Sequence, residues 1–201
     1  MKIVFQGDSI TDAGRDRSDA HKLAGYTTYV AEALGNENEY FNFGISGDRS
    51  VDVLNRFDAD FEVCGKPDVF CMLIGINDVW RNHDSNIYTS PEEYYNNVKA
   101  ILTKVREVNP DCTIVLLEPF LLPAEDKAHW VGEVAAIIAK LRLLAYEFAD
   151  AYIPYDGIFA KEYAFEDWRE YSLDGVHPTD KGNRLMAMYL TAELGLIFDE
   201  E

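Results

Sequence analysis

An uninterrupted apolar run from Val69 to Ile74 constrains the fold of this chain more than any other feature. A strand with one solvated face alternates apolar and polar residues, whereas a strand buried on both faces is apolar throughout. Doubly buried strands belong mainly to parallel sheets, because the helices that connect parallel strands cover both faces. The run therefore predicts a parallel sheet enclosed between two layers of helices.

Strand and helix patterns alternate along the rest of the chain. Strands are expected at short apolar runs: Lys2 to Gln6, Tyr40 to Phe43, Asp68 to Ile74, Thr113 to Leu117 and Ala151 to Pro154. Helices are expected where apolar residues recur at helical spacing: residues 26–34, 94–105, 131–148 and 185–190. This order predicts an α/β fold, a three-layer α/β/α sandwich with a central, mostly parallel five-stranded sheet. The length of 201 residues predicts a single domain over residues 1–201.

The second of these helices has a recognisable start. Ser90 and Glu93 have the spacing of a capping box, in which each side chain accepts the backbone N–H of the other residue. Pro91 suits the first turn, where a backbone N–H would have no partner within the helix. The helix is therefore expected to begin just after Ser90.

The charge balance excludes several kinds of partner. The chain has 18 Lys and Arg against 36 Asp and Glu, a formal net charge of −18, which repels nucleic acid and anionic membranes. No apolar run approaches the roughly 18 residues of a membrane span, and a strand pattern starts at Lys2. These features favour a soluble cytoplasmic protein. Cys64, Cys71 and Cys112 cannot all pair, and we expect them to be reduced core residues.

Small and polar residues follow three of the predicted strands and recur far downstream. The segments are Gly7 to Ile10, Gly44 to Asp48, Gly75 to Asp78 and Asp174 to Pro178. In open parallel sheets, ligands bind outside the carboxyl ends of the strands. The first three segments are therefore expected along one edge of the sheet.

The residue types in these segments suit acyl transfer. Ser9 is the candidate nucleophile, His177 the candidate base, and Asp174 could accept the other imidazole N–H across a turn. The backbone N–H groups of Ser9 and Gly47 and the side-chain amide of Asn77 could hold the oxyanion of a tetrahedral intermediate. Activity is expected to decline as His177 becomes protonated, below about pH 6.

These four segments resemble the conserved blocks of the SGNH hydrolases, also called the GDSL esterase family. Gly7-Asp8-Ser9 matches the first block, Asn42 followed by Gly47 the second, Gly75 to Asp78 the third, and Asp174 with His177 the last. The resemblance covers most of the chain. It implies a flavodoxin-like fold, Ser9 as nucleophile, Gly47 and Asn77 as oxyanion donors, and Asp174 with His177 completing the triad.

Two longer strings, Gly7 to Arg15 and Ile74 to Arg81, also resemble bacterial acetylxylan esterases of this family. This narrower resemblance implies the removal of acetyl groups from xylo-oligosaccharides and a possible homo-oligomer. An acidic surface is compatible with such neutral sugars. Trp80 and Arg81 are the candidate substrate contacts, although Arg81 could instead pair with an acidic residue.

Other polar and aromatic residues have simpler interpretations. Asp8 and Asp78 are expected to brace their loops by accepting backbone N–H groups. The remaining aromatic candidates for sugar stacking could equally fill the core; they are Trp130, Trp168 and Tyr171. The other three histidines lack the spacing and company of a metal site, so no metal is expected; they are His21, His83 and His129. The segment from Phe120 to Trp130 could shape the pocket or serve as a connector.

The leading hypothesis is a cofactor-independent serine esterase that acts on small acyl esters, with acetylated oligosaccharides as the favoured substrates. Two alternatives remain. The same catalytic residues could belong to a lysophospholipase or thioesterase with a longer acyl groove. The first segment could also cradle an anion in a non-catalytic sugar-binding or phosphate-sensing module, although the complete triad argues against this. The chain contains no phosphate-binding fingerprint of a nucleotide site.

Overall fold

The structure is a computed structural model and describes residues 1–199. Its strands are β1 (Lys2–Gly7), β2 (Glu39–Gly44), β3 (Val69–Leu73), β4 (Thr113–Leu117) and β5 (Ala151–Ile153). They form one sheet in the order β2-β1-β3-β4-β5, and every neighbouring pair is parallel. The predicted parallel five-stranded sheet is confirmed, and no strand end differs from its predicted position by more than one residue.

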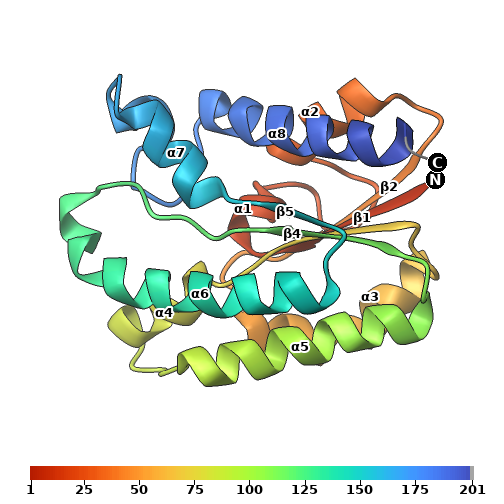
Figure 1. Cartoon of the computed structure of the whole chain (residues 1–201), viewed down its shortest axis with the longest axis horizontal. Helices are drawn as coiled ribbons and strands as arrows, with labels where there is room; N and C mark the ends of the chain where they lie inside the picture. The colour runs from red at the N-terminus through yellow and green to blue at the C-terminus, as the bar shows by residue number, and fades with distance from the viewer. Residues whose placement is uncertain (200–201) are drawn as a thin grey trace.

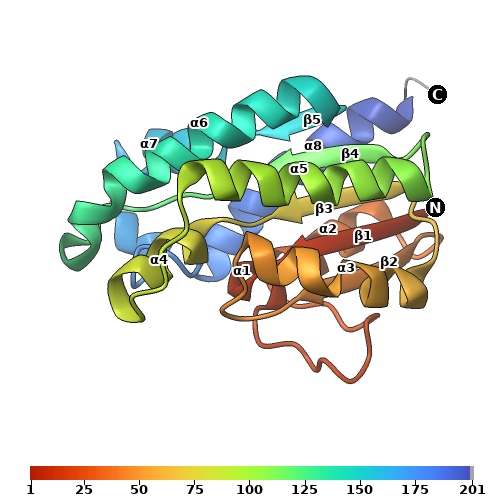
Figure 2. The same ribbon diagram turned by 90° about the horizontal axis from the view of Figure 1, so that it is seen from below.

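Helices cover both faces of the sheet. The α-helices are α1 (Ser9–Asp12), α2 (Tyr26–Leu34), α3 (Ser50–Cys64), α4 (Ile76–Asp84), α5 (Pro91–Val108), α6 (Val131–Phe148), α7 (Tyr155–Tyr163) and α8 (Asp180–Asp199). Two short 3₁₀ helices are η1 (Glu125–Trp130) and η2 (Trp168–Glu170). Helices α2 and α8 pack together on one face, and α3, α5 and α6 lie on the other (Figures 1 and 2). The three-layer α/β/α sandwich is therefore confirmed.

The central strands are buried as the apolar run predicted. Every residue of β3 is buried, and Ile3, Val4 and Phe5 of β1 are fully inaccessible. Helix α5 begins at Pro91 with the expected capping box, in which Glu93 N donates to Ser90 Oγ (3.2 Å) and Ser90 N donates to Glu93 Oε2 (2.8 Å). These interactions fix where the chain enters the helical layer.

Within residues 1–199, three α-helices of two turns or more were not predicted: α3, α4 and α7. Helix α3 buries Val53, Phe57 and Phe61 at intervals of four residues, among many acidic residues. This apolar stripe is narrow, so the hydrophobic pattern there is weaker than in α5 or α6.

The register of the sheet brings three turns to one level. Gly7 at the end of β1 pairs with Gly44 at the end of β2 and with Leu73 at the end of β3. The chain moves to one side of β1 to form β2 and to the other side to form β3, so the strand order reverses beside β1. Such a reversal leaves a crevice at the carboxyl ends of the strands.

The three cysteines are core residues, as expected. Cys64, Cys71 and Cys112 are buried and form no disulfide. Within residues 1–199, no helix is both long and apolar enough to span a bilayer. Over the same residues, no three His, Cys, Asp or Glu side chains are grouped closely enough to hold a metal ion.

Candidate active site

Ser9 lies at the amino end of α1, two residues after the end of the inner strand β1. Asp8 caps this helix, and its Oδ1 accepts the backbone N–H of Ile10 (3.0 Å). The cap sets the sharp change from strand to helix that presents Ser9 at the edge of the sheet. Ser9 Oγ lies 2.9 Å from His177 Nε2, although 168 positions separate the two residues in the sequence.

His177 is oriented by Asp174. His177 Nδ1 lies 2.7 Å from Asp174 Oδ2, so that one imidazole nitrogen faces the carboxylate and the other faces Ser9. Asp174 Oδ1 is held in place by three donors, the backbone N–H groups of Val176 (2.9 Å) and His177 (2.8 Å) and the Ser172 hydroxyl (3.2 Å). The His177 side chain is 46% exposed, which leaves it open to a bound molecule.

The hydrogen bond between His177 and Asp174 shifts the pKa of both side chains. The hydrogen bond to Asp174 raises the pKa of His177 above its usual value of 6.5, against the opposing effect of burial. Burial alone would raise the pKa of the Asp174 carboxyl. The hydrogen bonds that it accepts from His177 and Val176 outweigh burial and hold this pKa well below its usual range. Asp174 is therefore ionised whenever His177 titrates.

Asp8 has the opposite environment. It is almost completely buried, and its Oδ2 has no hydrogen-bond partner within residues 1–199. Burial raises the pKa of the Asp8 carboxyl to about 7, even though the hydrogen bond from Ile10 lowers it. As predicted, Asp8 and Asp78 brace their loops: Asp78 Oδ2 accepts the Ser50 N–H (2.9 Å) at the start of α3.

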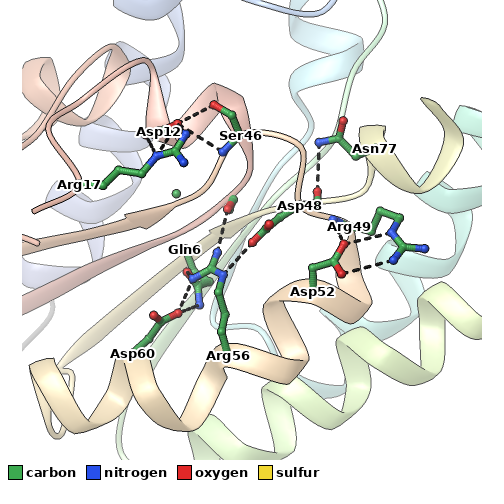
Figure 3. Close-up of polar contacts among 12 residues, drawn as sticks. Gln6, Asp12, Arg17, Ser46, Asp48, Arg49, Asp52, Arg56, Asp60 and Asn77 are labelled. Carbon is green, nitrogen blue, oxygen red and sulfur yellow. Dashed lines mark hydrogen bonds and ion pairs between the residues drawn. The ribbon is translucent and has the colours of Figure 1, made fainter. Parts of the chain in front are cut away.

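Gly47 and Asn77 lie on the turns that follow β2 and β3. Gly47 has a φ of 91°, in the left-handed region that glycine adopts without strain, and a Cβ there would lie 3.4 Å from Arg81. Asn77 is in the first turn of α4, and its Nδ2 donates to the Asp48 carbonyl (3.0 Å; Figure 3). That bond uses one of the two amide hydrogens and leaves the other free. Within residues 1–199, the backbone N–H groups of Ser9 and Gly47 donate no hydrogen bond.

The turn that carries Gly47 is tied to α1 by Asp12, which the sequence did not single out. Asp12 Oδ2 accepts the Ser46 hydroxyl (2.5 Å) and forms an ion pair with Arg17 (Figure 3). Asn42 adds a second tie, because its Nδ2 donates to the Thr11 carbonyl (2.7 Å) and its Oδ1 accepts the Gly44 N–H (2.8 Å). Such side-chain partners far apart in the sequence leave no periodic signal.

Two hollows meet at Ser9 and His177. The larger one, of about 680 Å³, lies between α1, α2 and the start of α8, and its walls include Ile10, Thr28, Tyr29, Glu32, Asp180 and Asn183. The smaller one, of about 340 Å³, lies between the turn after β2 and helix α4 and is lined by Gly47, Asn77, Trp80, Arg81 and Asp84. Ser46 borders both hollows.

The candidate aromatic residues separate into two groups. The Trp80 ring lies 5.9 Å from the His177 ring and 5.2 Å from the Trp130 ring, so both tryptophans belong to a cluster beside the site. Tyr171 is buried, with its ring 6.0 Å from Phe159. Trp168 is packed at the margin of the core and does not line either hollow. Arg81 forms an ion pair with Asp84, as the alternative interpretation of this residue expected.

The segment from Phe120 to Trp130 supports the turn that carries His177. Leu122 N donates to the Gly175 carbonyl (2.9 Å), and a Cβ on Gly175 would lie only 2.8 Å from the Ala124 side chain. Phe120 and Leu122 are buried. Lys127 lies over the Trp80 ring, with Nζ 5.5 Å from the ring centre. The segment therefore packs against the site, but none of its residues lines either hollow.

The parallel sheet and the side chains at its carboxyl edge define a hydrolase of α/β architecture. The chain belongs to the GDSL-like lipase/acylhydrolase family, whose model matches residues 5–185. It is therefore a carboxylic ester hydrolase that acts on small-molecule esters.

Relatives agree with this assignment over nearly the whole chain. An acetylxylan esterase of Geobacillus stearothermophilus is 29% identical over 211 residues, which cover 96% of this chain and 94% of the relative. A GDSL-like protein of Parabacteroides merdae has a crystal structure with a TM-score of 0.88 and 33% identity, over 95% of each chain. An α/β hydrolase from the metagenome of Lake Arreo, Spain, has a TM-score of 0.86 and 26% identity, over 96% of this chain and 94% of the other.

Proposed function

We propose that this enzyme is a serine esterase that removes acetyl groups from xylo-oligosaccharides or related sugars, with Ser9, His177 and Asp174 as its catalytic triad. The observation that carries the proposal is the continuous contact from Ser9 Oγ to His177 Nε2 (2.9 Å) and from His177 Nδ1 to Asp174 Oδ2 (2.7 Å). A serine hydroxyl is a weak nucleophile until a positioned base takes its proton. The imidazole is within hydrogen-bond reach of that proton.

In the first half of the reaction, Ser9 Oγ attacks the ester carbonyl carbon while its proton passes to His177 Nε2. The carbonyl oxygen becomes an oxyanion, which the N–H groups of Ser9 and Gly47 and the free amide hydrogen of Asn77 stabilise. His177 Nε2 then gives its proton to the ester oxygen, the bond from the carbonyl carbon to that oxygen breaks, and the alcohol leaves. Asp174 keeps Nδ1 protonated throughout and stabilises the imidazolium.

In the second half, water replaces the alcohol. His177 Nε2 takes a proton from the water as its oxygen attacks the acyl carbon on Ser9. The tetrahedral intermediate uses the same three donors. It collapses when the bond to Ser9 Oγ breaks and the proton on Nε2 returns to that oxygen, which releases the acid and the free enzyme.

The two hollows suit a short acyl group and a hydroxyl-rich alcohol. The smaller hollow holds the proposed oxyanion donors, and the paired charges of Arg81 and Asp84 on its wall are unfavourable for a long apolar chain. We assign the acyl group to this hollow, against Trp80. The larger hollow is lined by Tyr29, Glu32 and Asp180. Asp180 is already paired with Arg184 and with the Tyr29 hydroxyl, so Glu32 supplies the carboxylate that accepts hydroxyl hydrogen bonds and repels phosphate. We assign the sugar to this hollow.

Solved structures of a relative also support the proposal. One relative with a TM-score of 0.86 and 25% identity is an acetylxylan esterase of Geobacillus stearothermophilus. Variants of that enzyme with a serine or a histidine replaced by alanine are described as catalytic mutants. The roles proposed here for Ser9 and His177 use the same two residue types.

The nucleophile is tested by labelling and turnover together. Wild-type enzyme and Ser9→Ala are incubated with a serine-reactive phosphonate, and hydrolysis of p-nitrophenyl acetate is followed in parallel. We expect one phosphonyl group on Ser9, with loss of turnover in proportion to labelling, and neither labelling nor turnover in Ser9→Ala. Turnover that survives in Ser9→Ala would reject this nucleophile. Ser18→Ala is the matched control, because the exposed Ser18 hydroxyl contacts Asp16 and lines neither hollow.

The substrate is tested with acyl chain length and acetylated sugars. We expect kcat/KM for p-nitrophenyl esters to fall steeply beyond the shortest acyl groups, and acetylated xylo-oligosaccharides to release acetate. A rate that rises with chain length would instead favour the lysophospholipase or thioesterase alternative and would reject the assignment of the smaller hollow to a short acyl group.

A further inference from the structure

We propose that Arg56 is a positioning residue. Its single guanidinium group fixes the turn after β1, which carries Ser9, relative to the turn after β2, which carries Gly47. This inference rests on the proposed roles of Ser9, Gly47 and Asn77. Arg56 belongs to α3, which is not part of the four sequence segments that meet at the site. Its side chain is 16% exposed and lies beneath the turns that follow β1 and β2.

All three guanidinium nitrogens of Arg56 are used, and their partners lie on different segments. Nε donates to Asp48 Oδ2 (2.7 Å), next to Gly47, and Nη2 donates to the carbonyl of Gly7 (3.2 Å), two residues before Ser9. Nη1 donates to Gln6 Oε1 (3.2 Å) and forms an ion pair with Asp60 (Figure 3). One planar group therefore fixes the spacing between β1 and the turn that carries Gly47.

The network extends to the third proposed oxyanion donor. Asn77 Nδ2 donates to the backbone carbonyl of Asp48, the residue whose side chain Arg56 holds (Figure 3). The direction of the free amide hydrogen of Asn77 therefore depends on where Asp48 lies. The Gly7 carbonyl also accepts the N–H of Ile45 (3.1 Å), so the first and second turns meet at this oxygen.

The guanidinium is itself held from behind. Asp60 lies one helical turn after Arg56 on α3 and also accepts the side-chain amide of Gln6 (3.0 Å). Gln6 is fully buried in the inner strand β1, where an unpaired amide would be costly. Lysine has a single nitrogen and cannot reach Asp48, Gly7 and Gln6 together, so an arginine is required at this position.

The consequence concerns the reaction step more than substrate binding. Oxyanion donors act on charge that develops only in the transition state, and a displacement of about 1 Å can cost about 10²-fold in rate. Loss of Arg56 should therefore lower kcat and leave KM nearly unchanged. Arg56 contacts neither His177 nor Asp174, so the position of the acidic limb of the pH profile should not move.

The test compares Arg56→Gln with Arg106→Gln, using p-nitrophenyl acetate kinetics, pH profiles and thermal unfolding. Arg106 is a matched control, because it also binds backbone carbonyls, of Pro110 (3.1 Å) and Phe148 (2.8 Å), and a carboxylate, Asp150 (3.0 Å), but at the other end of the sheet. We expect Arg56→Gln to lose about 10²-fold in kcat at constant KM. Arg106→Gln is expected to lower the unfolding temperature and keep kcat.

Asp60→Asn provides a milder second variant if Arg56→Gln does not fold. It loosens the guanidinium without touching either turn, and we expect a smaller loss of kcat, again at constant KM and with an unmoved pH limb. A kcat in a folded variant within about threefold of wild type, or an equal loss in Arg106→Gln, would overturn the inference. Turnover that survives in Ser9→Ala would instead remove the proposed function, whatever the Arg56 variants show.

Discussion

The sharpest test of the proposed triad is Asp174→Asn, because the structure determines how the new amide must lie. Asp174 Oδ1 accepts hydrogen bonds from Ser172 Oγ, Val176 N and His177 N. Only the amide oxygen can take that place, since an NH₂ group would face three donors. The NH₂ group is therefore forced into the position of Oδ2, which lies 2.7 Å from His177 Nδ1.

An NH₂ group at this point donates to Nδ1 and selects the tautomer that is protonated on Nε2. That nitrogen then faces Ser9 Oγ with a hydrogen instead of a lone pair and cannot accept the serine proton. The same substitution in a serine protease, with its geometry intact, lowers kcat by about 10⁴-fold because of the wrong tautomer. We expect a loss of the same order in kcat/KM for p-nitrophenyl acetate.

Two measurements check this reasoning. Nitrogen NMR of labelled histidine should show the neutral-ring proton moving from Nδ1 to Nε2 in Asp174→Asn. The control is Asp167→Asn. Asp167 also accepts a backbone N–H from two residues further on, that of Arg169 (3.0 Å), but it does not contact the imidazole. A loss of less than about tenfold in Asp174→Asn, or an unchanged tautomer, would mean that another group orients His177.

Three further predictions follow from the same site. Asn77→Ala should lower kcat by about 10² to 10³-fold with little change in KM, because a transition-state donor is lost; a defect confined to KM would contradict this. Because Asp174 raises the pKa of His177, kcat/KM should rise with pH through a midpoint above 6.5, which is higher than the value near pH 6 expected from the sequence. A midpoint below 6.5 in the pH–rate profile would refute this prediction. The raised pKa of Asp8, from 3.8 to about 7, stabilises the fold at low pH, and this stability is lost as pH rises through the folded pKa. Relative to Asp8→Asn, the unfolding free energy of the wild type should therefore fall by on the order of 4 kcal/mol between about pH 4 and pH 8. Chemical denaturation measures both proteins, and a difference in unfolding free energy that stays constant over this range would show that Asp8 does not titrate there.

The sheet could be predicted because strands that are buried on both faces occur in the sequence as apolar runs. The run from Val69 to Ile74 is apolar at every position, and this signal survives without knowledge of any neighbour. Once the strands are parallel, their carboxyl ends share one edge, so the proximity of the segments after β1, β2 and β3 follows from the topology. Helix α3 was missed because its apolar stripe, Val53, Phe57 and Phe61, is interrupted by charged residues.

The network beneath the site could not be predicted in the same way. Arg56 binds Gly7 and Asp48, and Asp12 binds Ser46, yet these pairs are separated by 49, 8 and 34 positions. Such pairings leave no periodic pattern in the sequence. An arginine among acidic residues on a helix is typical of a face exposed to solvent. Only the relative placement of α3 and the two turns shows that the guanidinium is shared between them.

The position of His177 has a different physical origin from that of the other proposed residues. Ser9, Gly47 and Asn77 follow strands whose register fixes their relative level, whereas His177 follows no strand and reaches the sheet edge from a separate turn. That turn is closed by the bridge between Ser172 and Pro178 and anchored by the bond from Leu122 to Gly175 (2.9 Å). The segment after β4 thus fixes the position of His177, whereas strand pairing fixes the position of Ser9. Changes in residues 120–124 should therefore act on the contact between Ser9 and His177 more than on the oxyanion donors, because the level of Gly47 and Asn77 is set by the register of the strands that they follow.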